Sequence, residues 1–377
     1  MKKVLLVFGT RPEAIKMASL VKEFEKETSI SLKVCVTAQH RELLDQVLEV
    51  FEIKPDYDLN LMKSGQDLYD ITANVLLGMK NVLDDFQPDI VLVHGDTTTT
   101  SATALATFYQ KIRLGHIEAG LRTNNLYNPW PEEANRQITS VLSEYHFAPT
   151  KDSQDNLLNE NKNIEKVIVT GNTVIDALFF VVDKIEKDKL LKSSIVSTLS
   201  RQYKIDDSRK IILVTGHRRE NFGQKFINIC EALKTIALNN RDIDIVYPVH
   251  LNPNVQKPVK EILFDTNNIY LIDALRYEEF IYLMSKSYFI ISDSGGIQEE
   301  APSLGKPVLV LRDTTERPEA VEAGTVKLVG TDKDVIIKEA QTLLDDCDVY
   351  ESMSRAHNPY GEGKASKQIV NFIMEVI

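Results

Sequence analysis

Three carboxylates in the first half of the chain stand where acid–base groups would be useful. Asp96 and Glu118 follow or end apolar runs, and Glu132 stands at a predicted helix start. Several carboxylates gathered in one crevice are the groups that general acid–base chemistry uses. We therefore predict that they remove or deliver protons on a bound substrate.

Each of these carboxylates also has a structural interpretation. Asp96 suits the N-cap of the threonine-rich helix predicted after it, and Glu132 suits an i,i+4 ion pair with Arg136. For any one residue the structural role is at least as good an interpretation as catalysis. Their joint occurrence at strand ends and helix starts, where open α/β sheets bind ligands, favours chemistry.

Two similar phrases that contain arginine follow apolar strands, one in each half. They are Gly9-Thr10-Arg11-Pro12-Glu13 and Thr215-Gly216-His217-Arg218-Arg219-Glu220. In the first, Thr10 and Glu13 have the spacing of a capping box, and the free N–H groups of such a helix start suit phosphate. Arg11 and Lys16 add positive charge, although an ordinary capped helix with solvated basic residues is the alternative. Two such openings predict two like domains that bind one anionic ligand.

A histidine in the second phrase has a chemical interpretation of its own. His217 ends a strand beside two arginines, and a histidine next to phosphate can give a hydrogen bond or a proton to a departing oxygen. A lone histidine is more often structural, but the strand-end position favours function. The other histidines lack metal-ligand spacing, so we predict no catalytic metal; they are His40, His94, His116, His146, His250 and His357.

A third candidate is the run Ser292-Asp293-Ser294-Gly295-Gly296, which follows an apolar strand. Small residues let a ligand approach the backbone, and a helix predicted from Ile297 directs its N-terminus there. Glu299 and Glu300 follow in its first turn, where one can favour the helix dipole and the other can accept hydrogen bonds from ribose hydroxyls. The run is neither a Walker loop nor a nicotinamide fingerprint.

The elements that must position these residues alternate along the chain. Apolar strand-like runs separated by helical patterns predict parallel sheets with helical crossovers, and so a doubly wound α/β fold in each half. The predicted strands are 4–8, 32–37, 90–94, 114–118, 145–148 and 167–170, then 211–215, 243–249, 269–272, 289–292, 307–311 and 325–328. Predicted helices include 12–26 and 41–51, and an amphipathic helix over 365–377.

The length of 377 residues suits two domains. The lysine-rich stretch 184–210 separates the two series of strands. We predict an N-terminal Rossmann-like domain over 1–172, joined by a helix at about 362–377 that returns from the other end of the chain. This domain carries the catalytic carboxylates. We also predict a C-terminal Rossmann-like domain over 173–361, which binds the nucleotide part of the ligand.

Composition limits the partners and the compartment. Hydrophobic residues make up 43% and charged residues 26%, as in soluble globular proteins, and the net charge of −11 argues against nucleic acid. No segment is apolar over the length of a membrane span or a signal peptide. The three cysteines (Cys35, Cys230, Cys347) suit free thiols, so we predict a cytoplasmic protein with no membrane partner.

Phrases along essentially the whole chain resemble, in order, the non-hydrolysing UDP-N-acetylglucosamine 2-epimerase family. The resemblance is closest to the bacterial members that feed surface-polysaccharide biosynthesis. It is carried by residues 9–16, 37–42, 94–98, 117–122, 131–136, 170–173, 215–220, 247–250, 293–301 and 315–319.

The resemblance implies a glycosyltransferase-B fold, in which two Rossmann-like domains face a central cleft. It implies a reversible isomerisation of UDP-N-acetylglucosamine to UDP-N-acetylmannosamine, a homodimer, and no nicotinamide cofactor or metal. It also assigns residues. The implied catalytic positions are Asp96, Glu118, Glu132, Arg136 and His217. The implied substrate contacts are Arg11, Lys16, Asp96, Glu118, His217, Leu275 (to uracil through its backbone), Phe280, Ser294, Gly295, Gly296, Glu300 and Arg317.

A second substrate site regulates some relatives. Gln39 and His40 match it, but the arginine expected near Lys63–Asp67 is not evident, which argues against allosteric activation.

The implied chemistry agrees with the residue types. The sugar C2–H has no neighbouring carbonyl, so UDP must leave C1 first or concertedly, giving a 2-acetamidoglucal that UDP re-adds to with inversion at C2. Such a path needs a stabilised leaving diphosphate, acid–base groups on both sugar faces, and domain closure against water. Which carboxylate serves which face stays open. Alternatives are a glycosyltransferase on the same fold, a hydrolysing 2-epimerase and a non-enzymatic sugar-nucleotide sensor.

Overall fold

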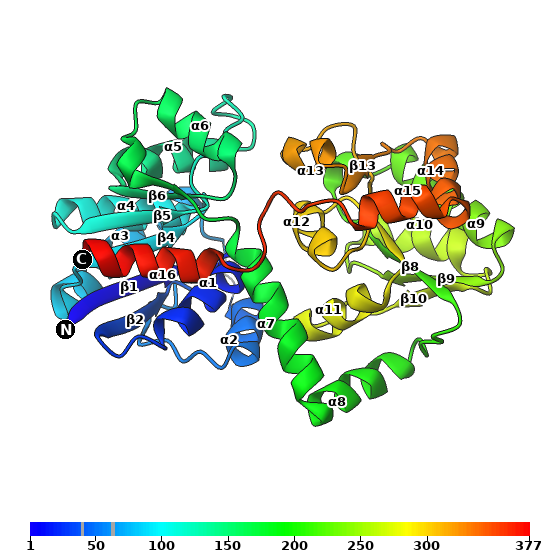
Figure 1. Ribbon diagram of the computed structural model, residues 1–377, viewed down its shortest axis with the longest axis horizontal. Coiled ribbons are helices and arrows are strands. Elements are labelled where there is room, and N and C mark those ends of the chain that lie inside the picture. The colour runs from blue at the N-terminus through cyan, green and yellow to red at the C-terminus, as the bar shows by residue number, and fades with distance from the viewer. Residues whose placement is uncertain (39–40, 62–64) are drawn as a thin grey trace. The chain divides into compact units, whose positions relative to one another are not determined.

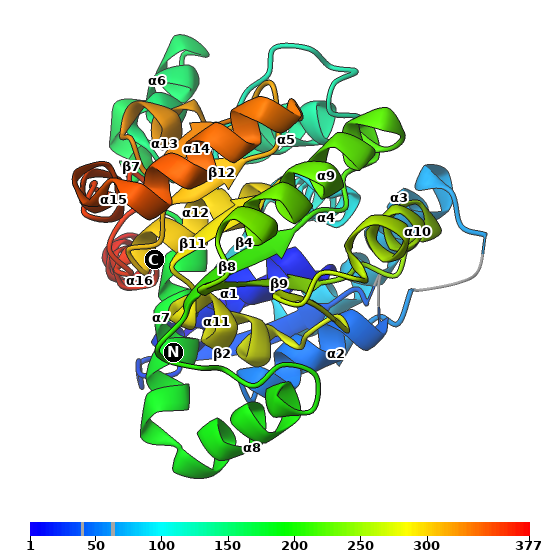
Figure 2. The same ribbon diagram turned by 90° about the vertical axis from the view of Figure 1, so that its right-hand side faces the viewer.

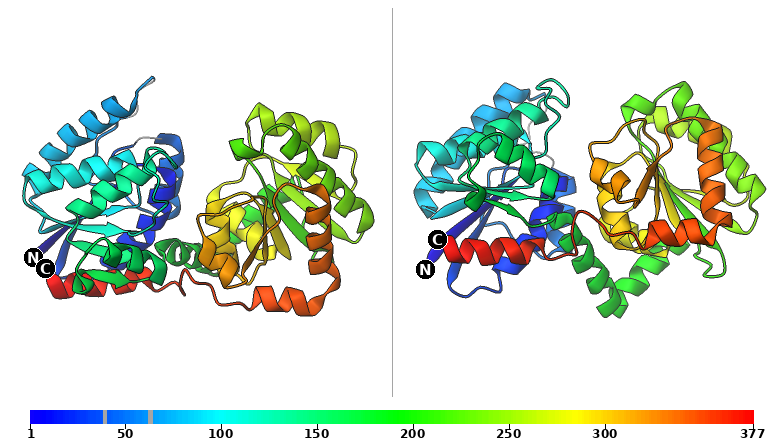
Figure 3. Two further views of the ribbon diagram at one scale, coloured as in Figure 1. Left: turned by 90° about the horizontal axis from the view of Figure 1, so that it is seen from above. Right: turned by 45° about the horizontal axis from the view of Figure 1, so that its top comes forward.

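The structure, a computed structural model, describes residues 1–38, 41–61 and 65–377. The chain divides into two compact units, residues 1–180 with 360–377 and residues 181–359. Each unit contains one sheet of parallel strands with helices on both faces (Figure 1, Figure 3). This is the doubly wound α/β architecture that the alternation of strand and helix patterns predicted for each half.

The first unit is built on a seven-stranded sheet in the order β3-β2-β1-β4-β5-β6-β7. Its strands are β1 (Lys2–Phe8), β2 (Ile30–Val36), β3 (Tyr57–Asp58), β4 (Ile90–His94), β5 (Arg113–Ile117), β6 (Tyr145–Ala148) and β7 (Val167–Val169). Its helices are α1 (Arg11–Phe24), α2 (Arg41–Val50), α3 (Leu68–Phe86), α4 (Thr98–Tyr109), α5 (Glu132–Leu142), α6 (Lys151–Asn159), the short η1 (Ile164–Lys166), most of α7 (Thr173–Lys187) and α16 (Ala365–Val376).

The central strands of this sheet are apolar on both faces because helices cover both. Leu5 and Val7 of β1 pack with Val91 and Val93 of β4 against α3 and α4. On the opposite face α1 lies between α2 and α16, and both chain termini belong to this unit (Figure 1). All seven strands run in one direction, so their carboxyl ends share one edge.

The second unit has a six-stranded parallel sheet in the order β10-β9-β8-β11-β12-β13. Its strands are β8 (Lys210–Thr215), β9 (Ile243–Pro248), β10 (Ile269–Ile272), β11 (Phe289–Ser292), β12 (Val308–Val310) and β13 (Val326–Leu328). Its helices are α8 (Lys189–Ser200), the short η2 (Arg219–Asn221), α9 (Gln224–Asn239), α10 (Pro253–Leu263), α11 (Tyr277–Lys286), α12 (Gly295–Ser303), α13 (Pro318–Glu322), α14 (Lys333–Asp345) and α15 (Cys347–Ser354). One face of the sheet is covered by α9, with α10 and α14 on its two sides (Figure 2).

The predicted strands are confirmed to within two residues at each end, and the structure adds the two-residue strand β3. The lysine-rich stretch contains the end of α7, all of α8 and a connecting loop. Cys35 and Cys230 are buried, Cys347 is exposed, and all three are free thiols. Across the described ranges, no helix has both the length and the apolar character that a bilayer span requires.

One carboxylate joins α7 to the C-terminal helix. Asp176 accepts hydrogen bonds from the backbone N–H groups of Ala365 (3.2 Å) and Ser366 (2.9 Å), at the start of α16. These N–H groups have no partner inside their own helix, so a side chain from another helix serves as their cap. Asp176 therefore fixes where the returning chain meets the first unit, although burial raises the pKa of its carboxyl to about 6.

We expect Asp176→Ala to lower the free energy of unfolding by about 1–2 kcal/mol, the usual cost of a lost N-cap. Urea unfolding followed by circular dichroism measures the change. Asp183→Ala on the same helix removes only an exposed ion pair with Lys187, so its unfolding midpoint should match that of the unaltered chain. Equal midpoints for the two variants would contradict the capping role.

Candidate active site

The carboxyl edge of the first sheet carries each predicted site residue of the first unit that the structure describes. Arg11 opens α1 just beyond β1, Asp96 follows β4 by two residues, and Glu118 directly follows β5. Glu132 and Arg136 lie in the first turns of α5. Since parallel strands end together, residues far apart in the chain reach one edge. Gln39, His40 and Lys63 lie outside the described residues.

Glu118 is held by a cation and an amide. Its Oε2 forms an ion pair with Nζ of Lys16 and accepts a hydrogen bond from Nδ2 of Asn172 at 2.8 Å. The Nε2 atom of His94 lies 3.7 Å from the same oxygen. The backbone of Glu118 has a φ of +60°, a left-handed conformation that costs energy for a residue with a side chain. The fold thus fixes this carboxylate at the cost of local strain.

Asp96 has the electrostatic surroundings of an acid–base group. Nη2 of Arg136 donates to Oδ2 of Asp96 at 2.6 Å, and Nδ2 of Asn135 donates to the Asp96 carbonyl at 3.0 Å. Burial raises the pKa of the Asp96 carboxyl to about 6; Arg136 opposes this rise, and the neighbouring Glu118 and Glu132 reinforce it. A carboxyl with this pKa has both protonation states available near neutral pH.

Both structural alternatives for these carboxylates are wrong. Thr97, not Asp96, is the N-cap of α4, because the side chain of Thr97 accepts from the N–H of Thr100. Arg136 forms its ion pairs with Asp96 and with Glu133, at 2.6 and 3.4 Å, instead of with Glu132. Glu133 is fully buried and accepts from the backbone N–H groups of Thr123 and Asn124.

The neighbouring residue Glu132 takes no part in holding this loop. Its Oε2 is buried, and no hydrogen-bond partner for it occurs among the described residues. The adjacent pair therefore divides its tasks: Glu133 holds the loop before α5, and Glu132 stays available to a ligand.

Three histidines support this edge from below. His94, His116 and His146 lie on neighbouring strands, with His116 in register with both Val93 and His146. Burial lowers their pKa values to about 4, 3 and 3, so they are neutral. Nε2 of His116 lies 2.7 Å from the Gly95 carbonyl and so holds the turn that carries Asp96. The sequence analysis did not predict this supporting role. The available signal was the presence of three histidines near the carboxyl ends of strands that turn out to be adjacent.

Glu13 is the polar centre of this edge. Its Oε2 accepts from the N–H groups of Gly9 (3.0 Å) and Thr10 (2.8 Å), and its Oε1 accepts from the hydroxyls of Thr97 (2.7 Å) and Thr100 (3.1 Å). The predicted capping box is confirmed. Glu13 also accepts hydrogen bonds from the next turn of the sheet edge, which the prediction did not include. Burial raises the pKa of Glu13, while the hydrogen bonds from Thr97, Gly9 and Thr10 favour its ionised form. Glu13 thereby ties the β1–α1 turn to the β4–α4 turn.

In the second unit, a guanidinium lies against the start of α12. Ser294 is the N-cap residue, and α12 begins at Gly295, two residues before the predicted start. A Cβ on Gly295 would lie 3.0 Å from Nη1 of Arg317, so glycine permits this close approach. Nε of Arg317 donates to Glu299 at 2.6 Å. A helix N-terminus and an oriented guanidinium at one place suit an anion.

Glu300 accepts a hydrogen bond from the hydroxyl of Tyr277 at 2.9 Å. Glu299 already pairs with Arg317, so Glu300 is the better candidate of the two for a hydroxyl-bearing ligand. Gly296 lies in the first turn of the same helix. Leu275, in the loop after β10, and Phe280, on α11, are both partly buried in this unit.

His217 is one of the residues that line a basic cavity. The cavity measures about 530 Å³ and is lined by His217, Arg218, Arg219, Glu220, His250 and Asn252. The rings of His217 and His250 stack with centroids 5.5 Å apart. The side chain of His217 is 46% exposed, so it remains accessible to a ligand. Charge and shape together favour an anion here.

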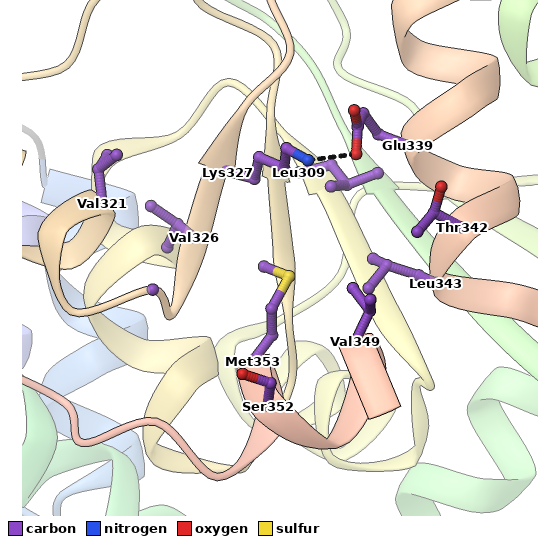
Figure 4. A pocket seen from close by; sticks show the side chains of 11 residues that line it. Leu309, Val321, Val326, Lys327, Glu339, Thr342, Leu343, Val349, Ser352 and Met353 are labelled. Carbon is purple, nitrogen blue, oxygen red and sulfur yellow. Dashed lines mark hydrogen bonds and ion pairs between the residues drawn. The ribbon is translucent and has the colours of Figure 1, made fainter. Parts of the chain in front are cut away.

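A separate cavity of about 340 Å³ lies in the second unit, between the edge strand β13 and helices α14 and α15 (Figure 4). Its lining is mostly apolar, with Val326 on one side and Leu343 on the other. Its charged residues, Lys327 and Glu339, pair with each other. Because their opposite charges compensate each other, they do not favour an anionic ligand in this cavity. Within the described ranges, no cluster of histidine, cysteine and carboxylate side chains is arranged to hold a metal ion.

The fold and the candidate site define a class of protein with two α/β units, each built on a parallel sheet, and with candidate ligand-binding groups at the carboxyl edge of each sheet. This is the arrangement of the glycosyltransferase-B fold. The glycotransferase of kitacinnamycin has this fold, with a TM-score of 0.67, 11% identity and coverage of 99% of this chain and 98% of that one. At that identity the likeness concerns the fold alone.

Closer relatives identify the family. A family model described as UDP-N-acetylglucosamine 2-epimerase matches residues 22–374. The chain is 67% identical to UDP-N-acetylglucosamine 2-epimerase of Campylobacter jejuni, over 99% of this chain and 98% of that protein. It is 58% identical, with a TM-score of 0.90, to the UDP-GlcNAc 2-epimerase from Neisseria meningitidis bound to UDP-GlcNAc, over 99% and 100% of the two chains. The chain belongs to the UDP-N-acetylglucosamine 2-epimerase family.

We expect Glu13→Gln to destabilise the chain by about 2–3 kcal/mol, because the amide replaces one acceptor oxygen and leaves buried N–H or hydroxyl groups unpaired. Chemical unfolding measures the loss, and turnover should fall with it because both turns lose their anchor. Glu25→Gln, at the exposed C-terminal end of the same helix, is the control and should leave unfolding unchanged. A Glu13→Gln chain as stable as the control would disprove the anchoring role.

Proposed function

We propose that the chain interconverts UDP-N-acetylglucosamine and UDP-N-acetylmannosamine without hydrolysis. UDP leaves C1 as the C2 proton is removed, giving a 2-acetamidoglucal. UDP then re-adds at C1, and a proton arrives at C2 from the opposite face. Membership of the epimerase family supports the reaction, and the acid–base groups of the first unit support the mechanism.

The carboxylates of the first unit are assigned to the sugar. Asp96, Glu118 and Glu132 are the candidates for removing and returning the C2 proton. The observation that carries the proposal is the setting of Asp96, whose pKa lies at about 6 next to two further carboxylates and the guanidinium of Arg136. Proton transfer on both faces needs at least two such groups, and a binding protein needs none.

Departure of the diphosphate is assigned to the basic groups. His217 donates to the leaving oxygen, and the start of α12 with Arg317 binds the phosphates, where charge stabilisation lowers the barrier most. Arg11 and Lys16 contribute positive charge from the first unit. Leu275 and Phe280 are assigned to the uracil, and Glu300 to the ribose. The predicted second substrate site at Gln39 and His40 stays a prediction.

We further propose a homodimer. The neighbouring helices α4 and α5 expose large apolar side chains in their C-terminal halves: Phe108 (56%), Tyr109 (65%), Ile138 (50%) and Val141 (72%). A group of such residues on one side of a unit is typical of a protein–protein contact. A cytoplasmic location is a separate proposal that rests on the three free cysteines.

Incubation with UDP-N-acetylglucosamine in deuterated water tests the reaction. We expect NMR to show UDP-N-acetylmannosamine with deuterium at C2, because the proton removed exchanges with solvent before another is delivered. Free N-acetylmannosamine with UDP would indicate the hydrolysing reaction. Sugar transfer to an added acceptor without C2 exchange would indicate a glycosyltransferase. The absence of both deuterium at C2 and UDP-N-acetylmannosamine would refute an epimerase.

Asp96→Asn tests the assignment of the acid–base groups. We expect turnover to fall by about 10²-fold or more, the usual contribution of a positioned acid or base, while UDP binding and unfolding stay close to those of the unaltered chain. Asp84→Asn, which changes an exposed carboxylate of α3 bonded to Gln110, serves as the matched control. Full activity in Asp96→Asn would remove this residue from the mechanism.

The dimer proposal predicts the effect of a charge on its contact. Val141→Lys and Ile138→Lys place a charge on the exposed side of α5, so we expect the sedimentation coefficient to fall to that of a monomer. Leu238→Lys, at an exposed apolar position of α9 in the other unit, should leave it unchanged. A monomeric unaltered chain would contradict the proposal directly.

A further inference from the structure

Asp293 is a buried acid beside the candidate anion site. It directly follows β11, lies one residue before the N-cap of α12, and has no solvent-exposed surface. A buried carboxylate is costly unless donors or a cation compensate for its lost hydration. The partners of its two oxygens therefore show what the residue does.

One oxygen holds the turn after β8. Oδ2 of Asp293 accepts from the backbone N–H groups of His217 and Arg218, each at 2.9 Å, and from Nδ2 of Asn221 at 3.3 Å. These donors belong to a turn that no sheet ladder pairs. Asp293 thus fixes the backbone that carries His217.

The other oxygen faces the imidazole. Oδ1 of Asp293 lies 3.4 Å from Nδ1 of His217. Oδ1 is buried, and within the described residues it has no hydrogen-bond donor in good geometry. The histidine nitrogen is its polar neighbour, and such contacts are often long before a ligand binds. The ring of His250 stacks on the His217 ring and restricts the plane of the imidazole.

We propose that Asp293 is the positioning residue of His217, which it orients with a proton on Nδ1 and with Nε2 left for the substrate. An ionised carboxylate only accepts hydrogen bonds, so the nitrogen that faces it must be the one that carries hydrogen. The inference rests on the proposed epimerase reaction and adds to it the group that prepares its leaving-group histidine.

The proton balance of the step is simple. When the C1–O bond breaks, its electron pair goes to the β-phosphate oxygen. The imidazolium of His217 gives the Nε2 proton to that oxygen and becomes a neutral ring that keeps Nδ1–H toward Asp293. The C2 proton goes separately to a carboxylate of the first unit. On re-addition the proton returns to Nε2 as the C1–O bond forms again.

The substitution Asp293→Asn distinguishes the roles of the two carboxylate oxygens. The amide oxygen can replace Oδ2 and keep the turn, while the amide NH₂ takes the place of Oδ1 and presents a donor to Nδ1. The ring must then carry its proton on Nε2. We expect kcat to fall by about 10²-fold or more, as when the carboxylate of a catalytic triad becomes an amide. KM for UDP-N-acetylglucosamine should change by less than about threefold, since ground-state contacts survive.

Two measurements distinguish positioning from support of the fold. ¹⁵N NMR of histidine-labelled protein at alkaline pH reports the tautomer, with His217→Asn identifying the signal; we expect Nδ1–H in the unaltered chain and Nε2–H in Asp293→Asn. In the His217→Asn background, adding Asp293→Asn should cost less than about threefold, because its effect passes through the ring. Tyr247→Phe is the control: it removes a hydroxyl that donates to the Gly216 carbonyl at 3.0 Å and leaves the carboxylate in place. Its kcat should match that of the unaltered chain.

The proposal is overturned by an unprotonated Nδ1 in the unaltered chain, by an unchanged kcat in Asp293→Asn, or by additive losses in the double variant. The tautomer of the unaltered chain needs neither turnover nor a folded variant. It therefore tests the contact even if Asp293→Asn fails to fold or the chain catalyses no epimerisation. An active chain with the wrong tautomer would instead leave the epimerase assignment intact.

Discussion

Both candidate sites depend on a buried carboxylate that pairs the N–H groups of a strand-end turn. Where a parallel strand stops, the chain leaves the sheet ladder, and its next N–H groups need acceptors inside the protein. Glu13 serves Gly9 and Thr10 after β1, and Asp293 serves His217 and Arg218 after β8. These acceptors hold the backbone of the turns that carry the candidate site residues.

The two acceptors have different origins, although the phrases around them are alike. Glu13 belongs to the third position of α1, so it folds back on its own N-cap. Glu220 holds the matching place in the second phrase but lies in η2, and α9 begins only at Gln224. Glu220 instead pairs with Arg312 at 3.2 Å. With no local carboxylate at the right helical position, the turn takes its acceptor from Asp293, directly after the neighbouring strand β11.

This difference explains how much of the molecule the sequence could predict. The strands and the capping box of α1 depend on neighbours a few residues apart, so periodicity and spacing were sufficient for them. The two-residue strand β3 was missed because it is too short for any period to show. Asp293 meets His217 across 76 positions, and Lys16 meets Glu118 across 102. Such partners are set by strand order and register, which a single sequence states only indirectly.

The acid–base group with the clearest setting also depends on that non-local arrangement. The Asp96 carboxyl keeps a pKa of about 6 despite its contact with Arg136, because lost hydration and two nearby carboxylates act against the guanidinium. A bound sugar would exclude further water and, like burial, would raise the pKa of the Asp96 carboxyl. The basic groups proposed for the diphosphate belong mostly to the other sheet, where Glu299 and Glu316 pair with Arg317. A carboxylate that accepts a proton and a cluster that binds an anion would neutralise each other on one turn, and the fold places the candidates for these two roles on different sheets.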